Sequence, residues 1–222
     1  MRTRFHHNLD QLTERLRTTC ELDHRAIEHA TGALLTADLD RAEQAINLCV
    51  RVAGMREASE HAAMTLLALQ APVASELRRV VTAIQLVGDL TRMGSLANHI
   101  ALIARRRHPG RAVPEAVEPV IARMGAVAAA VAESAAAVLN SCDPYDAAQL
   151  DNQDDAMDQL YGSVLDAVLA PDFDGGVIAA VDLALSARYY ERFADHAVEV
   201  GRRTIFMTTG ELKSTVRQAY RA

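Results

Sequence analysis

Two groups of acidic residues in the second half of the chain have the spacing of a metal site. Asp154 and Asp158 lie four residues apart, and Glu191, Asp195 and Glu199 repeat that interval. On a helix, this interval places the carboxyl groups of one segment on one face. If two such segments lie side by side, their carboxylates repel each other unless a cation lies between them. Oxygen-only sites of this kind bind Mg²⁺, Mn²⁺, iron and, in some proteins, Zn²⁺.

The same acidic residues also fit a solvated helix face that holds no metal. Arg188 and Arg192 each lie three residues before an acid and could neutralise Glu191 and Asp195 on the same helix. The spacing alone leaves both interpretations open. His196 follows Asp195 directly but projects about 100° away from it on a helix, so we expect His196 to be structural rather than a metal ligand.

Other signatures of catalysis or metal binding are incomplete. The motif Glu21-x-x-His24 occurs once, whereas a ferritin-like di-iron centre needs two such motifs and two further Glu residues. The sequence contains neither a Gly-x-Ser-x-Gly nucleophile motif nor a Gly-rich phosphate loop after a strand. Cys20, Cys49 and Cys142 are far apart, so we expect three buried thiols rather than disulfides or a zinc site. We therefore predict that the protein has no catalytic residues and is not an enzyme.

The elements that position these acids are predicted to be helices. Half of the 222 residues are hydrophobic, only 4% are aromatic, and Gly and Pro are scarce, which is the composition of an all-α protein. Apolar periodicity and Pro/Gly punctuation predict six long helices that end near residues 35, 71, 107, 140, 170 and 209. The fourth helix is expected to begin near Pro114, Pro144 to open the fifth, and Gly210 to terminate the sixth.

The two halves of the chain have the same layout. Residues 108–114 form the only clear linker in the sequence, and an offset of 100 residues places Val81 on Val181 and Arg92 on Arg192. We therefore predict an internal repeat of two tandem three-helix bundles, residues 1–109 and 110–210, followed by a polar tail at 211–222.

Charge and hydropathy restrict the function classes. The net charge of −6 argues against non-specific nucleic-acid binding, and the absence of Trp argues against base stacking. The N-terminus lacks the apolar core of a signal peptide. The most apolar stretch, residues 124–139, is interrupted by Glu133, and we expect it to be too short and too weakly apolar to span a bilayer. These features predict a cytoplasmic protein.

Three segments carry a resemblance to a known family. The sequence AVDLALSARYYERFADHAVEVGRRTIFMTTG, at 180–210, closely resembles the last helix of the PhoU family, the regulators of bacterial phosphate uptake. The Arg-Tyr-x-Glu-Arg-x-x-Asp-His pattern of that family is matched from Arg188 to His196. LLALQAPVASELRRVVTAIQLVGDL, at 66–90, and DDAMDQLY, at 154–161, resemble two further family segments in the same order. The resemblance spans nearly the whole chain.

The resemblance implies two three-helix bundles and a metal cluster in each, held by Asp/Glu-x-x-x-Asp pairs on two helices. Carried over to this sequence, the ligands of the second bundle are Asp154, Asp158, Glu191 and Asp195. The metal is expected to be iron, zinc, manganese or magnesium. Family resemblance does not fix which of these ions is native.

The first bundle departs from the family pattern. Thr91 and Ser95 replace the acids expected on the third helix, and the acids of the second helix fall near Cys49 and Ala53. Neutral side chains bind a hard cation far more weakly than carboxylates do. We therefore predict one metal site per chain, in the second bundle only. The nearby polar residues Asp89 and His99 are expected to be structural or surface groups.

The resemblance implies negative regulation of phosphate uptake and of the phosphate-starvation response. Such a regulator is an adaptor between the ATPase subunit of the phosphate-specific ABC transporter and the membrane histidine kinase that senses phosphate. It is peripheral to the membrane through these partners, and a homodimer is compatible with the resemblance. Two alternatives stay open: a carboxylate-bridged metal enzyme, which would turn over oxygen or peroxide at redox-active iron, and a metal-free helical scaffold with other partners.

Overall fold

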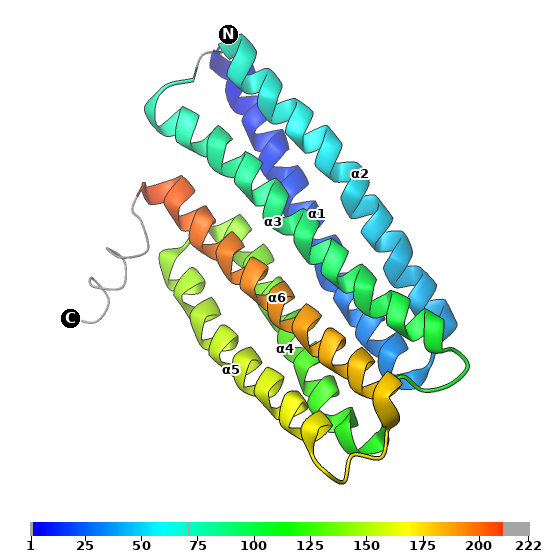
Figure 1. The fold of residues 1–222 in the computed structure, drawn as a ribbon. Helices are drawn as coiled ribbons and strands as arrows, with labels where there is room; N and C mark the ends of the chain where they lie inside the picture. The colour runs from blue at the N-terminus through cyan, green and yellow to red at the C-terminus, as the bar shows by residue number, and fades with distance from the viewer. Residues whose placement is uncertain (1, 71, 211–222) are drawn as a thin grey trace, which may run out of the picture.

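The computed structural model describes residues 2–70 and 72–210, and these residues form an all-helical body (Figure 1). A short 3₁₀ helix, η1, precedes the fourth long helix, and no strand occurs within the described ranges. The all-α prediction is therefore confirmed. The elements are α1 (Arg2–Thr36), α2 (Leu39–Gln70), α3 (Ala74–Arg107), η1 (Glu115–Val117), α4 (Glu118–Ser141), α5 (Pro144–Leu169) and α6 (Gly176–Thr209).

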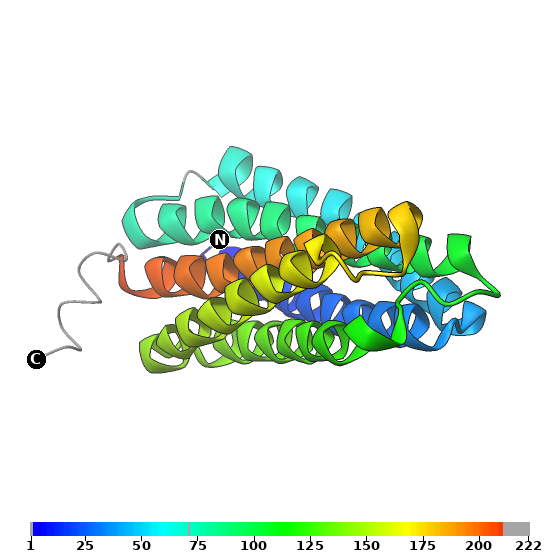
Figure 2. The same ribbon diagram turned by 60° about the horizontal axis from the view of Figure 1, so that its bottom comes forward.

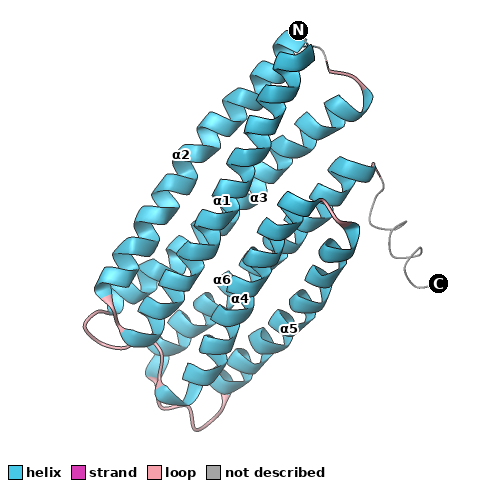
Figure 3. Cartoon of the chain, turned by 180° about the vertical axis from the view of Figure 1, so that it is seen from behind, coloured by secondary structure: helices cyan, strands magenta, loops and turns pink. Residues whose placement is uncertain are grey.

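The six long helices form two groups whose long axes lie roughly parallel to each other (Figures 1 and 2). Helices α1–α3 make the first bundle and α4–α6 the second, as seen from behind in Figure 3. The bundles meet through α3 against α6 and α1 against α4. Their buried side chains form one continuous hydrophobic cluster that extends from Phe5 to Met207. The tandem three-helix prediction is confirmed, and the two bundles share one core.

Pro144 opens α5 and Gly210 follows the end of α6, as the sequence predicts. Asp143 precedes α5, and its carboxylate accepts a hydrogen bond of 2.8 Å from the backbone N–H of Tyr145. Gly210 ends α6 in the left-handed conformation, with φ at 80°. The predicted start of the fourth helix is wrong by four residues. Pro114 precedes the 3₁₀ turn, and α4 begins only at Glu118, because the chain makes one tighter turn before it enters the regular helix.

Helices α1 and α4 approach each other closely at Gly125. A Cβ atom at this position would lie only 2.2 Å from Thr31 Cγ2, so the contact requires a residue without a side chain. The hydroxyl groups of Thr31 and Tyr190 form a buried hydrogen bond of 2.8 Å. Helices from both bundles are therefore joined at one point of the core.

Polar contacts join α3 to α6 along the other interface between the bundles. His196 Nδ1 lies 3.1 Å from Asp89 Oδ1, and Arg203 Nε lies 2.7 Å from Asp89 Oδ2. The rings of His99 and Tyr189 stack with their centroids 5.0 Å apart. Asp89, His99 and His196 thus have structural contacts between the bundles, as the sequence predicts.

Two smaller expectations from the sequence are wrong. Cys20 and Cys49 are buried, but Cys142 is partly exposed because it forms the left-handed C-cap of α4, with φ at 54°. By length and composition alone, Glu115–Ser141 is apolar enough to cross a membrane, since the helical segment is longer than the stretch judged from the sequence. A core helix passes the same test, and α4 packs against α1, α5 and α6. The predicted tail at 211–222 lies outside the described residues.

Candidate metal site and its counterpart in the first bundle

Glu191 is the central carboxylate of the predicted site in the second bundle. It lies on α6, which packs against α5, and its side chain is only 12% exposed. Its Oε1 atom lies 2.5 Å from Arg188 Nη1. Its other oxygen, Oε2, is buried and accepts no hydrogen bond within the described part of the chain. A buried carboxylate oxygen without a donor is costly, so this atom is suited to bind a cation.

Two of the other predicted ligands share the electrostatic environment of Glu191. Burial is the main reason that the pKa of Glu191 is raised, and the negative charge of Asp195 raises it further. Arg188 and Arg192 lower the pKa, whereas Asp158, on α5, raises it. Asp195 on the same helix and Asp158 across the α5–α6 contact therefore both act on Glu191. Asp154 lies one turn before Asp158 on α5 and is half-buried.

Arginine side chains supply the positive charge at these acids. Arg192 Nη1 lies 3.2 Å from Asp195 Oδ2, and Arg192 Nε lies 3.9 Å from Glu191 Oε2. The Arg188 guanidinium also lies over the Tyr161 ring, 5.9 Å from its centroid. Across residues 2–70 and 72–210, no three His, Cys, Asp or Glu side chains converge in a geometry that could hold a metal. The oxygen donors fit a cation chemically, but the arginines must move before a cation can take their place.

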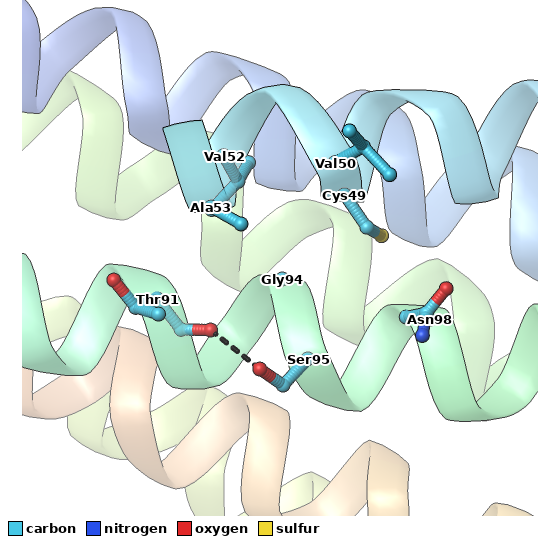
Figure 4. A pocket seen from close by; sticks show the side chains of 8 residues that line it. All are labelled: Cys49, Val50, Val52, Ala53, Thr91, Gly94, Ser95 and Asn98. Carbon is cyan, nitrogen blue, oxygen red and sulfur yellow. Dashed lines mark hydrogen bonds between the residues drawn. The ribbon is translucent and has the colours of Figure 1, made fainter. Parts of the chain in front are cut away.

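The first bundle contains a pocket at the equivalent position, between α2 and α3 (Figure 4). Its volume is about 200 Å³. Cys49, Ala53, Thr91 and Ser95, the four positions at which the sequence lacks the family's acids, all line it. The alignment of α2 and α3 with the second and third helices of the family pattern is therefore consistent with the structure. The residues that line this pocket include no carboxylate.

Sequence reasoning missed one acidic residue near this pocket. Asp23, on α1, is fully buried, and neither of its carboxyl oxygens has a hydrogen-bond partner among the described residues. The available signal was an acid on the apolar face of the first helix, where Cys20 and Ile27 precede and follow it at helical spacing. That signal does not reveal which residues of other helices surround the carboxyl group.

Comparisons with known proteins agree with this architecture. The family model described as "PhoU domain" matches residues 16–104 and 121–204, which lie in the first and second bundles respectively. The phosphate-specific transport system accessory protein PhoU homolog 2 of Mycobacterium tuberculosis is 51% identical over 210 residues, which cover 95% of this chain and 99% of that protein. PhoU homolog 1 of Mycobacterium leprae is 49% identical over 210 residues, with 95% of both chains covered.

Solved structures support the same fold. The crystal structure of PhoU from Pseudomonas aeruginosa matches with a TM-score of 0.86 at 21% identity, covering 93% of this chain and all of that one. PhoU from Streptococcus pneumoniae, a phosphate transport system regulatory protein, matches with a TM-score of 0.81 at 24% identity, covering 94% of this chain and 98% of that one. At these identities the structures support the fold alone. Together with the two matched domains and the close relatives, they lead to one conclusion: the chain belongs to the PhoU family.

Proposed function

We propose that this protein is an accessory regulator of a phosphate-specific transport system, which restrains phosphate uptake and the phosphate-starvation response. The observation that carries this proposal is the 51% identity to a phosphate-specific transport system accessory protein over 95% of the chain. Both bundles match the family model, so the similarity covers both halves of the chain rather than one of them.

The regulator acts as a cytoplasmic adaptor that is peripheral to the membrane. It binds the ATPase subunit of the transporter and the cytoplasmic part of the phosphate-sensing histidine kinase, and it favours the partner conformation to which it binds more tightly. Exposed apolar side chains near the start of α3 and near the start of α6 are candidate docking contacts at two separate places, because the two helices pack antiparallel. They include Leu77, Val81, Val181 and Leu185, which are between 41% and 51% exposed.

A pull-down from host membranes tests the adaptor role. Tagged protein is recovered from cells grown in high and in low phosphate, and its partners are identified by mass spectrometry. We expect phosphate-dependent recovery of the transporter ATPase or the kinase, and weaker recovery with Val81→Asp and Val181→Asp. The matched control is Val50→Asp, because Val50 is also exposed but lies on α2. Recovery of neither partner in either condition would contradict the proposal.

The second bundle is proposed to hold a structural metal ion. Asp154, Asp158, Glu191 and Asp195 are its ligands, and they suit iron, manganese, magnesium or zinc. The bound ion supplies positive charge that removes carboxylate repulsion between α5 and α6. A ligand that binds only the folded state stabilises it by linkage, so Asp158→Asn and Asp195→Asn should lower metal content and melting temperature together. Asp10→Asn, at an exposed position on α1, is the control. Loss of the metal without a change in stability would exclude a structural role.

A further inference from the structure

The third helix of each bundle exposes an apolar stripe near its start. On α3, Leu77 and Val81 are 41% and 42% exposed, and on α6, Val177 and Val181 are 80% and 51% exposed. In both helices the two side chains lie four residues apart and therefore share one face. The second pair follows the first by 100 residues, which is the offset of the internal repeat. The repeat therefore includes an exposed feature as well as the buried core.

An approximate twofold axis relates the two stripes. Arg78, near the start of α3, donates to the Met207 carbonyl at 3.3 Å, and the guanidinium of the last residue of α3 lies 3.6 Å from Asp182. The two helices are therefore antiparallel. Midway between these contacts lie Met93 on α3 and Phe193 on α6, which are equivalent in the repeat and fully buried. Equivalent positions of two antiparallel helices lie level with each other only at the axis that relates the helices, so the axis passes near this pair.

Both stripes lie on the same face of the molecule. Helix α3 packs against α1, α2 and α6, and helix α6 packs against α3, α4 and α5. In Figure 1, α3 and α6 lie side by side in front of α1 and α4, so their exposed sides point away from α1 and α4. The centre of each stripe lies about 14 residues from the axis, and a helix rises about 1.5 Å per residue, so the stripes are about 40 Å apart. The face thus presents the same apolar feature twice, on opposite sides of its axis.

Arginine side chains occupy the centre of this face. Arg92 and Arg192, which are also equivalent in the repeat, are exposed next to the buried pair at the axis. Arg192 is paired with Asp195 at 3.2 Å, but Ser95 takes the place of this acid in the first bundle. Arg92 consequently forms no ion pair with any residue that the structure describes. The centre of the face is complementary to a carboxylate, whereas a second copy of this chain would bring arginines against arginines.

We propose that the α3–α6 face docks the pair of ATPase subunits of the transporter, with one copy of this chain bound to each pair. The approximate axis of the chain coincides with the twofold axis of the pair, so each ATPase subunit covers one apolar stripe and acidic groups near the partner's axis meet Arg92. A symmetric pair presents every patch twice, and a chain with one stripe could use only one of the two patches. The inference rests on the proposed function, which supplies the ATPase as partner.

Site-directed cross-linking of the full-length protein tests this arrangement. Val81→Cys and Val181→Cys are made separately in a Cys142→Ala background, which removes the partly exposed native thiol. Each variant is labelled with a photoactivated cross-linker and mixed with the detergent-solubilised transporter, which carries the ATPase in two copies. We expect both positions to cross-link to the same segment of the ATPase subunit. Cross-links to two different segments, or from one position only, would overturn the proposal.

Stoichiometry and affinity test the same arrangement independently. Mass photometry should find one chain per transporter. Linking two contacts raises avidity by about 10²–10⁴, so Val81→Asp and Val181→Asp should each weaken binding at least about 100-fold and by similar factors. Arg92→Glu should also weaken binding, and the exposed controls Val50→Asp on α2 and Arg25→Glu on α1 should not. Two chains per transporter, or an effect at one stripe alone, would contradict symmetric docking.

Failure of this inference and failure of the proposed function give different results. If the wild type binds the transporter or the kinase but not in this manner, the adaptor role stands and symmetric docking on the ATPase pair is wrong. If the wild type binds neither, the proposed function is wrong as well. Sedimentation of the chain alone tests the other occupant. We expect Val81→Asp and Val181→Asp to leave the oligomeric state unchanged, and a dimer that both substitutions dissociate would assign this face to a second copy of the chain.

Discussion

Arg192 sets the charge balance of the acids on α6. Its guanidinium contacts both Asp195 and Glu191, and its side chain is half exposed. A metal ion must displace this guanidinium, so Arg192→Gln should raise the affinity of the second bundle for Mn²⁺. Exposed ion pairs contribute about 0.2–1 kcal/mol, which corresponds to a change in affinity of about 1.4- to fivefold. Titration calorimetry with Mn²⁺ measures it.

Arg25→Gln is the matched control for this substitution. Arg25 is an exposed arginine on α1, in the other bundle, so its replacement changes the net charge equally without touching the acids. Equal effects of both substitutions would mean that Arg192 acts only through the overall charge of the protein. Weaker Mn²⁺ binding in Arg192→Gln would mean that Arg192 organises the site instead of competing for it.

Asp23 should make the stability of the metal-free protein depend on pH. Burial raises the pKa of its carboxyl group well above the ordinary value. Below the ordinary pKa, both the folded and the unfolded chain carry the proton, and Asp23 contributes no pH dependence. Above it, the unfolded chain loses the proton while the folded chain keeps it, so stability falls as pH rises toward the folded pKa.

Asp23→Asn removes this proton and nearly preserves the shape of the side chain. In chelator, the difference in unfolding free energy between Asp23→Asn and the wild type should therefore shift in favour of the variant as pH rises from the acid side. Denaturant titrations at several pH values measure this difference in unfolding free energy. A difference that stays constant with pH would mean that the Asp23 carboxyl is solvated in solution, and a shift in favour of the wild type would mean that it is paired with a cation.

At the scale of helices, the close approach of α1 and α4 is the most sensitive contact. Gly125→Ala places a methyl group against Thr31, and overpacking of this kind costs about 1–3 kcal/mol. Thr31→Ala makes room for that methyl group, so the two substitutions together should cost less than the sum of their separate effects. Denaturant unfolding of the two single variants and the double variant measures the coupling.

Gly88→Ala on α3 is the control for this comparison of single and double variants. A Cβ atom there has no neighbour within 4 Å, so the change should stabilise the helix by about 0.5–1 kcal/mol. If Gly125→Ala is also neutral or stabilising, α1 and α4 are farther apart in solution than this contact requires.

The sequence predicted the helices better than their mutual contacts. Apolar periodicity and caps such as Gly210 are local signals. The existence and the ends of the helices were therefore predicted largely correctly, apart from the 3₁₀ turn before α4. The ion pair of Arg192 with Asp195 was an open alternative because three residues separate the partners on one helix. The contact of Asp89 with His196 spans 107 positions in sequence, and no local pattern encodes it.

The pocket of the first bundle shows the same division between local and long-range information. A family motif was enough to place Cys49 opposite Thr91, because each position follows from counting along its own helix. The position of Asp23 behind Gly94 depends on how three helices pack together. Only the tertiary structure could relate that acid to the pocket, since burial and the absence of a partner are properties of the assembled bundle.

At the scale of the whole molecule, the shared core predicts cooperative unfolding of both bundles. One hydrophobic cluster contains buried side chains of all six long helices, and the Thr31–Tyr190 hydrogen bond crosses between the bundles. Calorimetry of the metal-free protein should therefore show one transition whose calorimetric and van't Hoff enthalpies agree.

Substitutions in the two bundles distinguish a shared core from two independent ones. Ile27→Val in the first bundle and Phe193→Leu in the second each remove buried apolar volume, because both side chains are fully buried. With a shared core, each variant lowers the melting temperature of the same single transition. If Phe193→Leu instead splits the transition, so that one half keeps the wild-type melting temperature, the bundles unfold separately. A metal bound in the second bundle would then stabilise that bundle alone, whereas with a shared core it stabilises the whole protein.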